Sequence, residues 1–229
     1  MRIVALIPAH DEADRIADTV LAARNVAGVT EVVVVDDGSA DDTASSAESA
    51  GARVVRLPRN VGKGAALDAG LASLDGPTDV LLLLDADLGA SASEAAALLG
   101  PIADGSADMT VAKFPPPSGK AGFGLVKGLA RWGIARLGEG MRVSAPLSGQ
   151  RALDSAAVRA VTPFAFGYGV EVALTVRAAR AGLRVVEVET TMEHSATGRD
   201  AAGFAHRGRQ FVHVASALLR LAFERGRKV

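Results

Sequence analysis

The sequence has no cysteine, one tryptophan, one tyrosine and a net charge of only −1. Without cysteine, neither disulfide bonds nor thiolate metal sites can form. A charge this small gives no basic field over the surface, so we expect no nucleic-acid partner. No stretch reaches the roughly 18 uninterrupted apolar residues of a membrane-spanning helix. The apolar run after Met1 is broken by Pro8 too soon for a signal peptide. These absences predict a soluble, cytoplasmic protein.

What the sequence does contain is an alternation of short apolar runs and amphipathic segments, in a chain of 229 residues that is 49% apolar. Buried strands are predicted for the apolar runs at 3–7, 31–35, 52–57 and 80–84. Further strands are expected at 109–113, 148–153 and 183–188, with helices over 122–137 and from 204 to about 223. Strands that alternate with helices over short loops predict an α/β fold with a doubly wound, mostly parallel sheet.

The most informative stretch is the apolar run Val80–Leu84, which leads directly into Asp85 and Asp87. Ionised carboxylates cannot remain unpaired inside a buried strand. Both should therefore emerge at the carboxyl edge of the sheet, where α/β proteins bind ligands. A turn there can bring both carboxylates onto one hard divalent cation, either Mg²⁺ or Mn²⁺. Taken alone, the pair is more typical of a solvated acidic turn.

Four of the predicted loops carry motifs, and each follows one of the first four predicted strands. They read Pro8-Ala9-His10-Asp11-Glu12, Asp36-Asp37-Gly38-Ser39, Asn60-Val61-Gly62-Lys63-Gly64 and Asp85-Ala86-Asp87. In order and spacing they resemble the motifs of inverting family-2 glycosyltransferases with the A-type nucleotide-sugar fold. The closest resemblance is to the dolichol-phosphate mannose synthase-like branch, and it covers nearly the whole chain.

This resemblance implies one glycosyltransferase domain over 1–229 that moves a hexose from a UDP- or GDP-sugar to an acceptor, with inversion and a divalent metal. The nucleotide-sugar-binding half would be 1–112, the acceptor half 113–200 and the C-terminal helix 201–229.

The resemblance assigns the donor to residues of the first half. It implies that Pro8 and Ala9 shape the pocket floor and that Glu12 and Asp37 bind the base or the ribose. Such carboxylates accept hydrogen bonds from N–H and O–H groups. Lys63 is expected to contact a phosphate or the edge of the base. The alternatives are a helix-terminal acid for Glu12 and a solvated loop lysine for Lys63.

The same resemblance implies that Asp85 and Asp87 hold the Mg²⁺ or Mn²⁺ ion that bridges the donor diphosphate. Asp87 would contact the metal directly, whereas Asp85 would contact it through water or bind the ribose. A divalent cation offsets the charge of the departing nucleoside diphosphate. His194 lies in a polar loop where relatives that make glucosyl-phosphoglycerate place a third ligand, and imidazole suits Mn²⁺ better than Mg²⁺. The alternative for His194 is a loop histidine bonded to the backbone.

The acceptor side is implied by the segment Pro146–Arg151, which resembles the Ser-Gly-Phe-Arg segment of that branch with Gln150 in place of the aromatic residue. Gln150, Arg151 and Arg199 are therefore expected to bind the acceptor or a phosphate, because arginine matches phosphate oxygens. Glu171 stands where hydroxyl-accepting relatives carry a general base, and it is also a helix N-terminal acid. For Arg199 the alternative is a solvated helix start.

Charge in the second half favours a phosphate-bearing acceptor. Between residues 113 and 151 there is no acid until Glu139, and the cations are Lys113, Lys120, Lys127, Arg131, Arg136, Arg142 and Arg151. A hydroxyl needs a base to remove its proton, whereas a phosphate is already anionic and needs cations. We therefore expect a phosphate-bearing acceptor, and the resemblance of the triple-proline loop and the helix after it to the polyprenyl-phosphate branch implies polyprenyl phosphate. A soluble phosphorylated acceptor such as a phosphoglycerate, or a sugar hydroxyl, remains an alternative.

The last predicted helix has a wide apolar face and basic ends. Its stripe consists of Phe211, Ala215, Leu218 and Ala222, widened by Val212, Leu219 and Phe223 and flanked by Arg220, Arg225, Arg227 and Lys228. Such a face suits a homodimer interface or a peripheral contact with an anionic membrane. Packing against the protein's own sheet is the alternative.

Three other functions fit parts of the pattern less well. A sugar-phosphate nucleotidyltransferase needs a glycine- and arginine-rich loop after the first strand, where this chain has Pro8–Glu12. A receiver-type signalling module could use Asp36, Asp37 and Asp85, but such modules are much shorter and carry their acidic pair after the first strand. A Rossmann dehydrogenase needs Gly-x-Gly-x-x-Gly after a strand, and no such motif follows a strand here.

Overall fold

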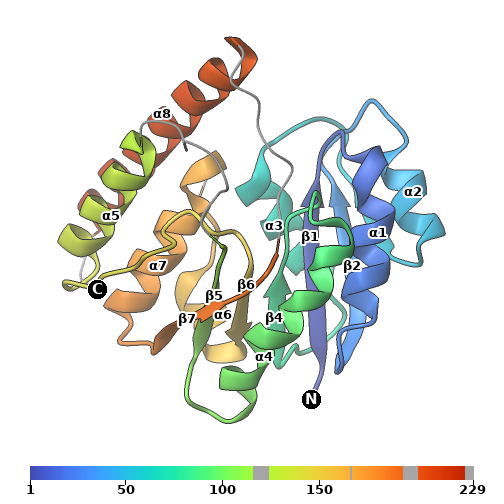
Figure 1. Cartoon of the computed structure of the whole chain (residues 1–229), viewed down its shortest axis with the longest axis horizontal. Coiled ribbons are helices and arrows are strands. Elements are labelled where there is room, and N and C mark those ends of the chain that lie inside the picture. The colour runs from blue at the N-terminus through green and yellow to red at the C-terminus, as the bar shows by residue number, and fades with distance from the viewer. Residues whose placement is uncertain (116–123, 166, 193–200, 225–229) are drawn as a thin grey trace.

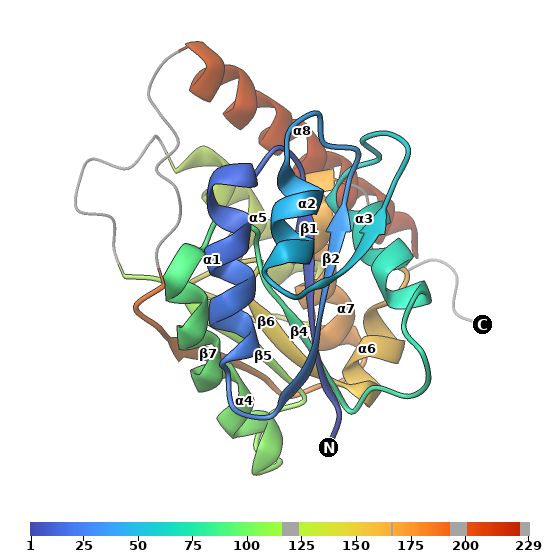
Figure 2. The same ribbon diagram turned by 90° about the vertical axis from the view of Figure 1, so that its right-hand side faces the viewer.

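A computed structural model describes residues 1–115, 124–165, 167–192 and 201–224, without the side chains of residues 168 and 201–209. The chain folds into a seven-stranded sheet with helices on both faces, as Figure 1 and Figure 2 show. The predicted doubly wound α/β fold is confirmed. In chain order the elements are β1 (Ile3–Ala9), α1 (Ala13–Arg24), β2 (Val29–Asp36), α2 (Thr43–Ser49), β3 (Arg53–Arg56), α3 (Lys63–Ala72), β4 (Val80–Leu83), η1 (Gly89–Ala95), α4 (Ala96–Ala103), β5 (Met109–Lys113), α5 (Leu125–Leu137), β6 (Arg151–Asp154), α6 (Ser155–Val161), η2 (Gly167–Gly169), α7 (Val170–Arg180), β7 (Val185–Glu189) and α8 (Ala201–Glu224).

The sheet has the strand order β3-β2-β1-β4-β6-β5-β7. β1 pairs in parallel with β2 and β4, β2 with β3, and β5 with β7, whereas β6 runs antiparallel to both β4 and β5. The loops after β1, β2, β3 and β4 therefore lie at one edge of the sheet, which we call the carboxyl edge. The segment before β6 reaches the same edge from the opposite direction. The sheet thus gathers all four motif loops in one place.

Alternate residues of the central strand β1 face opposite layers of helices. Ile3, Ala5 and Ile7 join a core with α1, α2 and α4, while Val4 and Leu6 join a second core with α3, α6 and α7. A third apolar cluster lies farther out, where α5 and α8 pack against α7 (Figure 1). In the part of the chain that the structure describes, no helix is long and apolar enough to cross a bilayer.

The two predicted halves share this one sheet, because β6 and β7 of the second half join the strands of the first. The division at residue 112 stays a prediction.

Two local expectations are wrong, and one helix was not predicted. β1 does not stop before Pro8 but continues to Ala9, whose carbonyl accepts a hydrogen bond from Asp37 N at 2.8 Å. The strand expected at 148–153 begins only at Arg151. The pattern also misses helix α6, although its N-cap Asp154 accepts a hydrogen bond from Ala157 N at 2.6 Å.

Candidate active site

The carboxyl edge brings Lys63, Asp85 and Glu171 together. Lys63 begins α3, Asp85 follows β4, and Glu171 lies in the first turn of α7. Lys63 Nζ donates to Asp85 Oδ1 at 2.6 Å and to Glu171 Oε1 at 2.7 Å. The three side chains are 22%, 25% and 7% exposed, respectively. A single ammonium group therefore joins two largely buried carboxyl groups, and we call these three residues the lysine–carboxylate cluster.

The charge of Lys63 is held by this environment. Burial lowers the pKa of Lys63, but the neighbouring carboxyl groups of Asp85 and Glu171 outweigh burial and raise the pKa above its ordinary value. Lys63 is therefore positively charged at neutral pH. Two carboxyl groups already bind this ammonium group, and the predicted contact of Lys63 with a phosphate stays a prediction.

The segment before β6 adds a further contact to Asp85. Gln150 is fully buried; its Nε2 donates to Asp85 Oδ2 at 2.6 Å, and its Oε1 accepts from Ser148 Oγ at 3.2 Å. Gly149 lies so close that a Cβ there would come within 2.6 Å of Lys63 Nζ and 2.7 Å of Asp85 Oδ1. A side chain at position 149 would displace the ends of the Lys63 and Asp85 side chains.

Arg151 lies in the interior, where it binds protein groups. It is fully buried, and its guanidinium donates to Ser148 O, Glu171 O and Thr175 Oγ1, each at 3.0 Å. Burial lowers the pKa of Arg151 to about 10, which leaves it charged at neutral pH. These bonds fix the segment before β6 to the start of α7. They support a positioning role for Arg151, and its predicted contact with the acceptor stays a prediction.

Helix α1 anchors the acidic turn that carries Asp85 and Asp87. Thr19 on this helix is fully buried; its Oγ1 donates to Ala86 O at 2.8 Å and accepts from Gly89 N at 2.8 Å. The helix therefore fixes the backbone of the turn that carries both carboxyl groups assigned to the metal. Sequence reasoning does not identify Thr19, because a threonine inside a helix has no distinguishing feature in the sequence.

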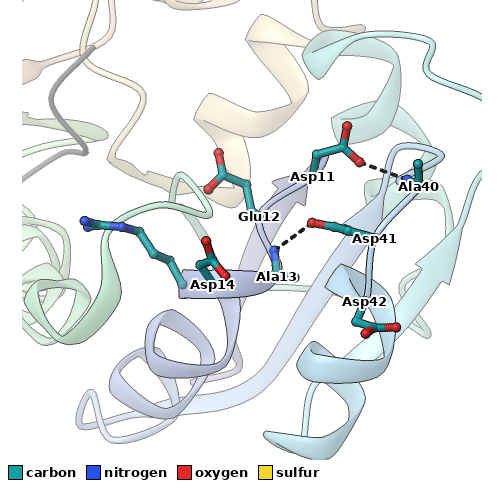
Figure 3. Close-up of a pocket in the computed structure, with 8 residues that line it drawn as sticks. Asp11, Glu12, Ala13, Asp14, Ala40, Asp41 and Asp42 are labelled. Carbon is teal, nitrogen blue, oxygen red and sulfur yellow. Dashed lines mark hydrogen bonds between the residues drawn. The ribbon is translucent and has the colours of Figure 1, made fainter. Parts of the chain in front are cut away.

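Glu12 lies next to this turn and lines a pocket of about 420 Å³ (Figure 3). The pocket is formed by the first two loops of the carboxyl edge, with the residues Asp11, Glu12, Ala13, Asp14, Arg15, Ala40, Asp41 and Asp42. Burial raises the pKa of Glu12, and nearby carboxylates, Asp87 the strongest, raise it further against the opposing effect of Arg15. Glu12 therefore adds a third acidic group to the surroundings of Asp85 and Asp87.

The two loops that line this pocket are hydrogen-bonded to each other. Figure 3 shows Asp11 Oδ1 accepting from Ala40 N at 2.9 Å and Asp41 Oδ2 accepting from Ala13 N at 3.2 Å. The carboxylates of Asp11 and Asp41 thus bind backbone N–H groups and hold the two loops together. Glu12 makes no side-chain hydrogen bond to another described residue, which suits its predicted role as a ligand-binding group.

Asp37 joins the second loop of the carboxyl edge to the third. Its side chain is buried, and its two carboxylate oxygens accept from Val61 N at 2.7 Å and from Gly62 N at 2.8 Å. These bonds hold the loop that leads to Lys63. The predicted contact of Asp37 with the base or ribose stays a prediction. Asp36, the last residue of β2, accepts from Ser39 N at 3.1 Å and so helps to hold the loop that follows the strand.

The chain matches known proteins over this whole arrangement. Residues 4–142 match the sequence model of Glycosyl transferase family 2. The chain belongs to this family. It is 29% identical over 204 residues to the undecaprenyl-phosphate mannosyltransferase of Micrococcus luteus, a match that covers 83% of each protein. It is 34% identical over 196 residues to the glucosyl-3-phosphoglycerate synthase of Mycolicibacterium paratuberculosis, covering 76% of this chain and 59% of that protein.

Solved structures of related glycosyltransferases have the same fold. The glucosyl-3-phosphoglycerate synthase of Mycobacterium tuberculosis, in complex with Mn²⁺, uridine diphosphate and phosphoglyceric acid, superposes with a TM-score of 0.80 at 27% identity, covering 96% of this chain and 78% of that chain. The same synthase with Mg²⁺ and uridine diphosphate gives a TM-score of 0.77 at 29% identity, with 96% and 79% coverage. The predicted family and fold are confirmed. The relatives differ in acceptor, so they do not favour polyprenyl phosphate over phosphoglycerate.

Two predicted site residues of this glycosyltransferase, His194 and Arg199, lie outside the described residues. Pro8 and Ala9 end β1 at the carboxyl edge, as the donor assignment requires. Among the residues that the structure describes, no group of three His, Asp or Glu side chains is arranged to enclose a metal ion. The metal assignments therefore stay predictions.

Glu187 on β7 is a further residue that sequence reasoning misses. Its carboxylate accepts from Ser144 N and Ser144 Oγ, both at 2.7 Å, and from Ala145 N at 2.6 Å. Burial raises the pKa of Glu187, but these hydrogen bonds outweigh burial and hold the pKa below its usual value. Glu187 thereby anchors the segment that leads to Gln150.

Proposed function

We propose that this chain transfers a hexose, with inversion, from a nucleoside-diphosphate sugar to a phosphate-bearing acceptor, and that it requires Mg²⁺ or Mn²⁺. The observation that carries the proposal is the lysine–carboxylate cluster of Lys63, Asp85 and Glu171 at the carboxyl edge. It sets a phosphate-attracting cation between the donor side and the acceptor side. The relatives support the proposal, because their names specify sugar transfer to undecaprenyl phosphate and to a phosphoglycerate.

The residues present fit a divalent cation. Asp87 would hold it directly and Asp85 through water, because hard cations take carboxylate oxygens. The pKa of Glu12 is raised by burial and then by the closeness of Asp87, and a cation at this turn would offset that repulsion. When bound, the cation stabilises the negative charge of the departing nucleoside diphosphate.

The chain's own residues would orient the donor around this turn. Lys63 would attract the diphosphate oxygens from its place 2.6 Å from Asp85 Oδ1. The nucleoside would lie along the first loops, against Pro8, Ala9 and Glu12. Because these loops are hydrogen-bonded to each other, the donor would bind to a surface that is already formed.

The acceptor would enter on the side of Glu171. A phosphate oxygen attacks without losing a proton, whereas a hydroxyl needs a base that contributes roughly 10²–10⁴-fold in rate. We favour polyprenyl phosphate, because a phosphate nucleophile needs cations and no base, and the acceptor half contains the cations Lys127, Arg136 and Arg142. A phosphoglycerate hydroxyl is the second candidate, and the similarity to the mycobacterial synthase is compatible with it.

A donor screen tests the reaction class. UDP- and GDP-sugars are added with Mn²⁺, and both the unfolding midpoint and slow hydrolysis of the donor are measured. We expect one donor to raise the midpoint only when the metal is present. If no nucleotide sugar does so, and none is hydrolysed, the proposal is wrong.

Glu171→Gln separates the two acceptors. With polyprenyl phosphate we expect turnover to fall little and the pH profile to keep its shape, because the nucleophile carries no proton to remove. If turnover fell about 10²-fold or more and the acid limb of the pH profile disappeared, Glu171 would be a general base and the acceptor a hydroxyl. Unfolding of the variant is measured alongside, since the substitution also removes the contact with Lys63. The predicted homodimer and cytoplasmic location stay predictions.

A further inference from the structure

Most of the large apolar side chains that reach solvent lie on two neighbouring helices. Among the described residues eight large apolar side chains are exposed, and the six on α5 and α8 are Leu125, Trp132, Phe211, Val212, Leu219 and Phe223. Trp132, the only tryptophan of the chain, is 64% exposed, and Leu219 is 60% exposed. Exposed apolar side chains gathered in this way mark an interaction site.

Helices α5, α7 and α8 run in the same direction. Arg180, the last residue of α7, donates from Nε to Leu137 O at the end of α5 at 2.9 Å. It also donates from Nη2 to Leu221 O near the end of α8 at 3.0 Å. The final turns of the three helices therefore lie together. Their first turns point toward the carboxyl edge, where Glu171 opens α7.

The exposed side chains share one outer face of the α5–α8 pair. The two helices touch where Gly133 meets Leu218, and both bury their inner residues against α7. Each residue of a helix is turned by about 100° from the one before it. Trp132 lies one residue before Gly133 on α5, and Leu219 lies one residue after Leu218 on α8. Because the two helices run parallel and face each other, these opposite rotations bring both side chains to the same side of the pair, away from α7.

Positive charge lies on the helices that carry this outer face. Helix α5 has no acid; Arg136 lies one turn after Trp132, Lys127 is on the side of Ala130 and Ile134, and Arg131 donates to Ser144 O at 2.9 Å. On α8, Arg220 is exposed, and the acid Glu224 is paired with Arg177 at 2.7 Å. A second copy of the chain, joined by a two-fold axis, would set these cations against each other. An anionic surface would neutralise them.

We propose that the outer face of α5 and α8 docks on an anionic lipid surface. Tryptophan is favoured at the boundary between headgroups and acyl chains, and an apolar helix face with basic flanks lies in that boundary. Docking goes beyond the proposed function and is independent of it, because it needs neither donor nor acceptor. It would bring the carboxyl edge, with Glu171, to the side of a membrane that carries a lipid-linked phosphate.

Trp132 supplies a readout confined to this face, because the chain has no other tryptophan. The full chain is titrated with vesicles of phosphatidylglycerol and, separately, of phosphatidylcholine. With the anionic vesicles we expect the emission to move to shorter wavelength and quenching by aqueous iodide to fall. With the neutral vesicles we expect neither change. Added salt should weaken the binding, because exposed charges are screened.

Point substitutions separate this face from the rest of the surface. Leu219→Glu should weaken binding to anionic vesicles roughly 10- to 100-fold, since it removes an apolar group that the lipid would bury. Arg220→Ala should weaken binding by about fivefold. The matched control is Leu21→Glu on α1, where the leucine is 48% exposed and far from this face in sequence; it should leave binding unchanged. Unfolding midpoints confirm that each variant is folded.

Three results would overturn the proposal. The first is Trp132 emission that does not respond to anionic vesicles. The second is an equal loss of binding in Leu21→Glu and Leu219→Glu. The third is an emission shift that appears with rising protein concentration in the absence of vesicles, which would assign the face to a second copy of the chain.

Discussion

Lys63→Met removes the cation at the centre of the lysine–carboxylate cluster. The substitution keeps an unbranched apolar stem but deletes the ammonium group, which lies 2.6 Å from Asp85 Oδ1 and 2.7 Å from Glu171 Oε1. Removing one partner of a buried ion pair costs about 3–5 kcal/mol, because the remaining charge stays buried without a counterion. Lys63 and Asp85 are 22% and 25% exposed, so solvent reduces the effect toward the lower value. We expect the unfolding midpoint to fall by about 6–12 °C.

The raised pKa of Lys63 sets the pH range over which wild type and Lys63→Met differ in stability. A group whose pKa is higher in the folded chain than in the unfolded chain stabilises the fold below the unfolded pKa, here 10.5. The stabilisation is lost as the pH rises through the folded pKa. The difference between wild type and Lys63→Met should therefore persist throughout the neutral range.

Lys113→Met is the matched control for this experiment. Lys113 Nζ also lies 2.7 Å from a carboxylate oxygen, that of Glu189, but the two side chains are 43% and 82% exposed. Water screens this pair, so its loss should not change the midpoint measurably. Thermal and urea unfolding, followed by circular dichroism, measure both variants. The double variant Lys63→Met/Glu171→Gln should recover part of the lost stability, because it removes one of the two stranded carboxylates. If Lys63→Met unfolds like Lys113→Met, the cluster does not stabilise the fold and the reasoning is refuted.

Three further predictions concern the surroundings of the cluster. Asp87→Ala should abolish Mn²⁺-dependent binding of the nucleotide sugar while leaving the fold intact; unaltered affinity by calorimetry would remove Asp87 from the metal site. Gly149→Ala would place a Cβ 2.6 Å from Lys63 Nζ, and we expect turnover to fall on the order of 10²-fold; normal turnover in a steady-state assay would contradict the close approach. The lowered pKa of Glu187 stabilises the fold above the unfolded pKa of 4.5, and this contribution is lost as the pH falls through the folded pKa. Denaturant unfolding at a series of pH values should show this loss of stability in the wild type and not in Glu187→Gln. If stability falls with pH equally in both proteins, Glu187 does not contribute in this way.

Local sequence patterns were sufficient to predict most helices and strands and the edge of the sheet at which the motifs meet. Five apolar residues at Val80–Leu84 followed by carboxylates indicate a buried strand that ends at the surface. The strand at Met109–Lys113 was predicted with the bounds that the structure shows. An apolar run carries no information about the direction of its neighbours, however. The antiparallel course of β6 therefore became visible only in the assembled sheet.

The partners of the side chains were decided by the tertiary structure alone. Lys63 is separated by 22 residues from Asp85 and by 108 from Glu171, so no spacing rule connects them. Arg151 was predicted to bind the acceptor or a phosphate, yet the fold surrounds its guanidinium with acceptors of the protein itself. On α8 the periodicity identified a wide apolar face, but the positions of α5 and α7 decide that Leu218 is buried and Leu219 exposed. Periodicity in a sequence reports which residues avoid water, whereas the contacts of each group depend on segments that only folding brings together.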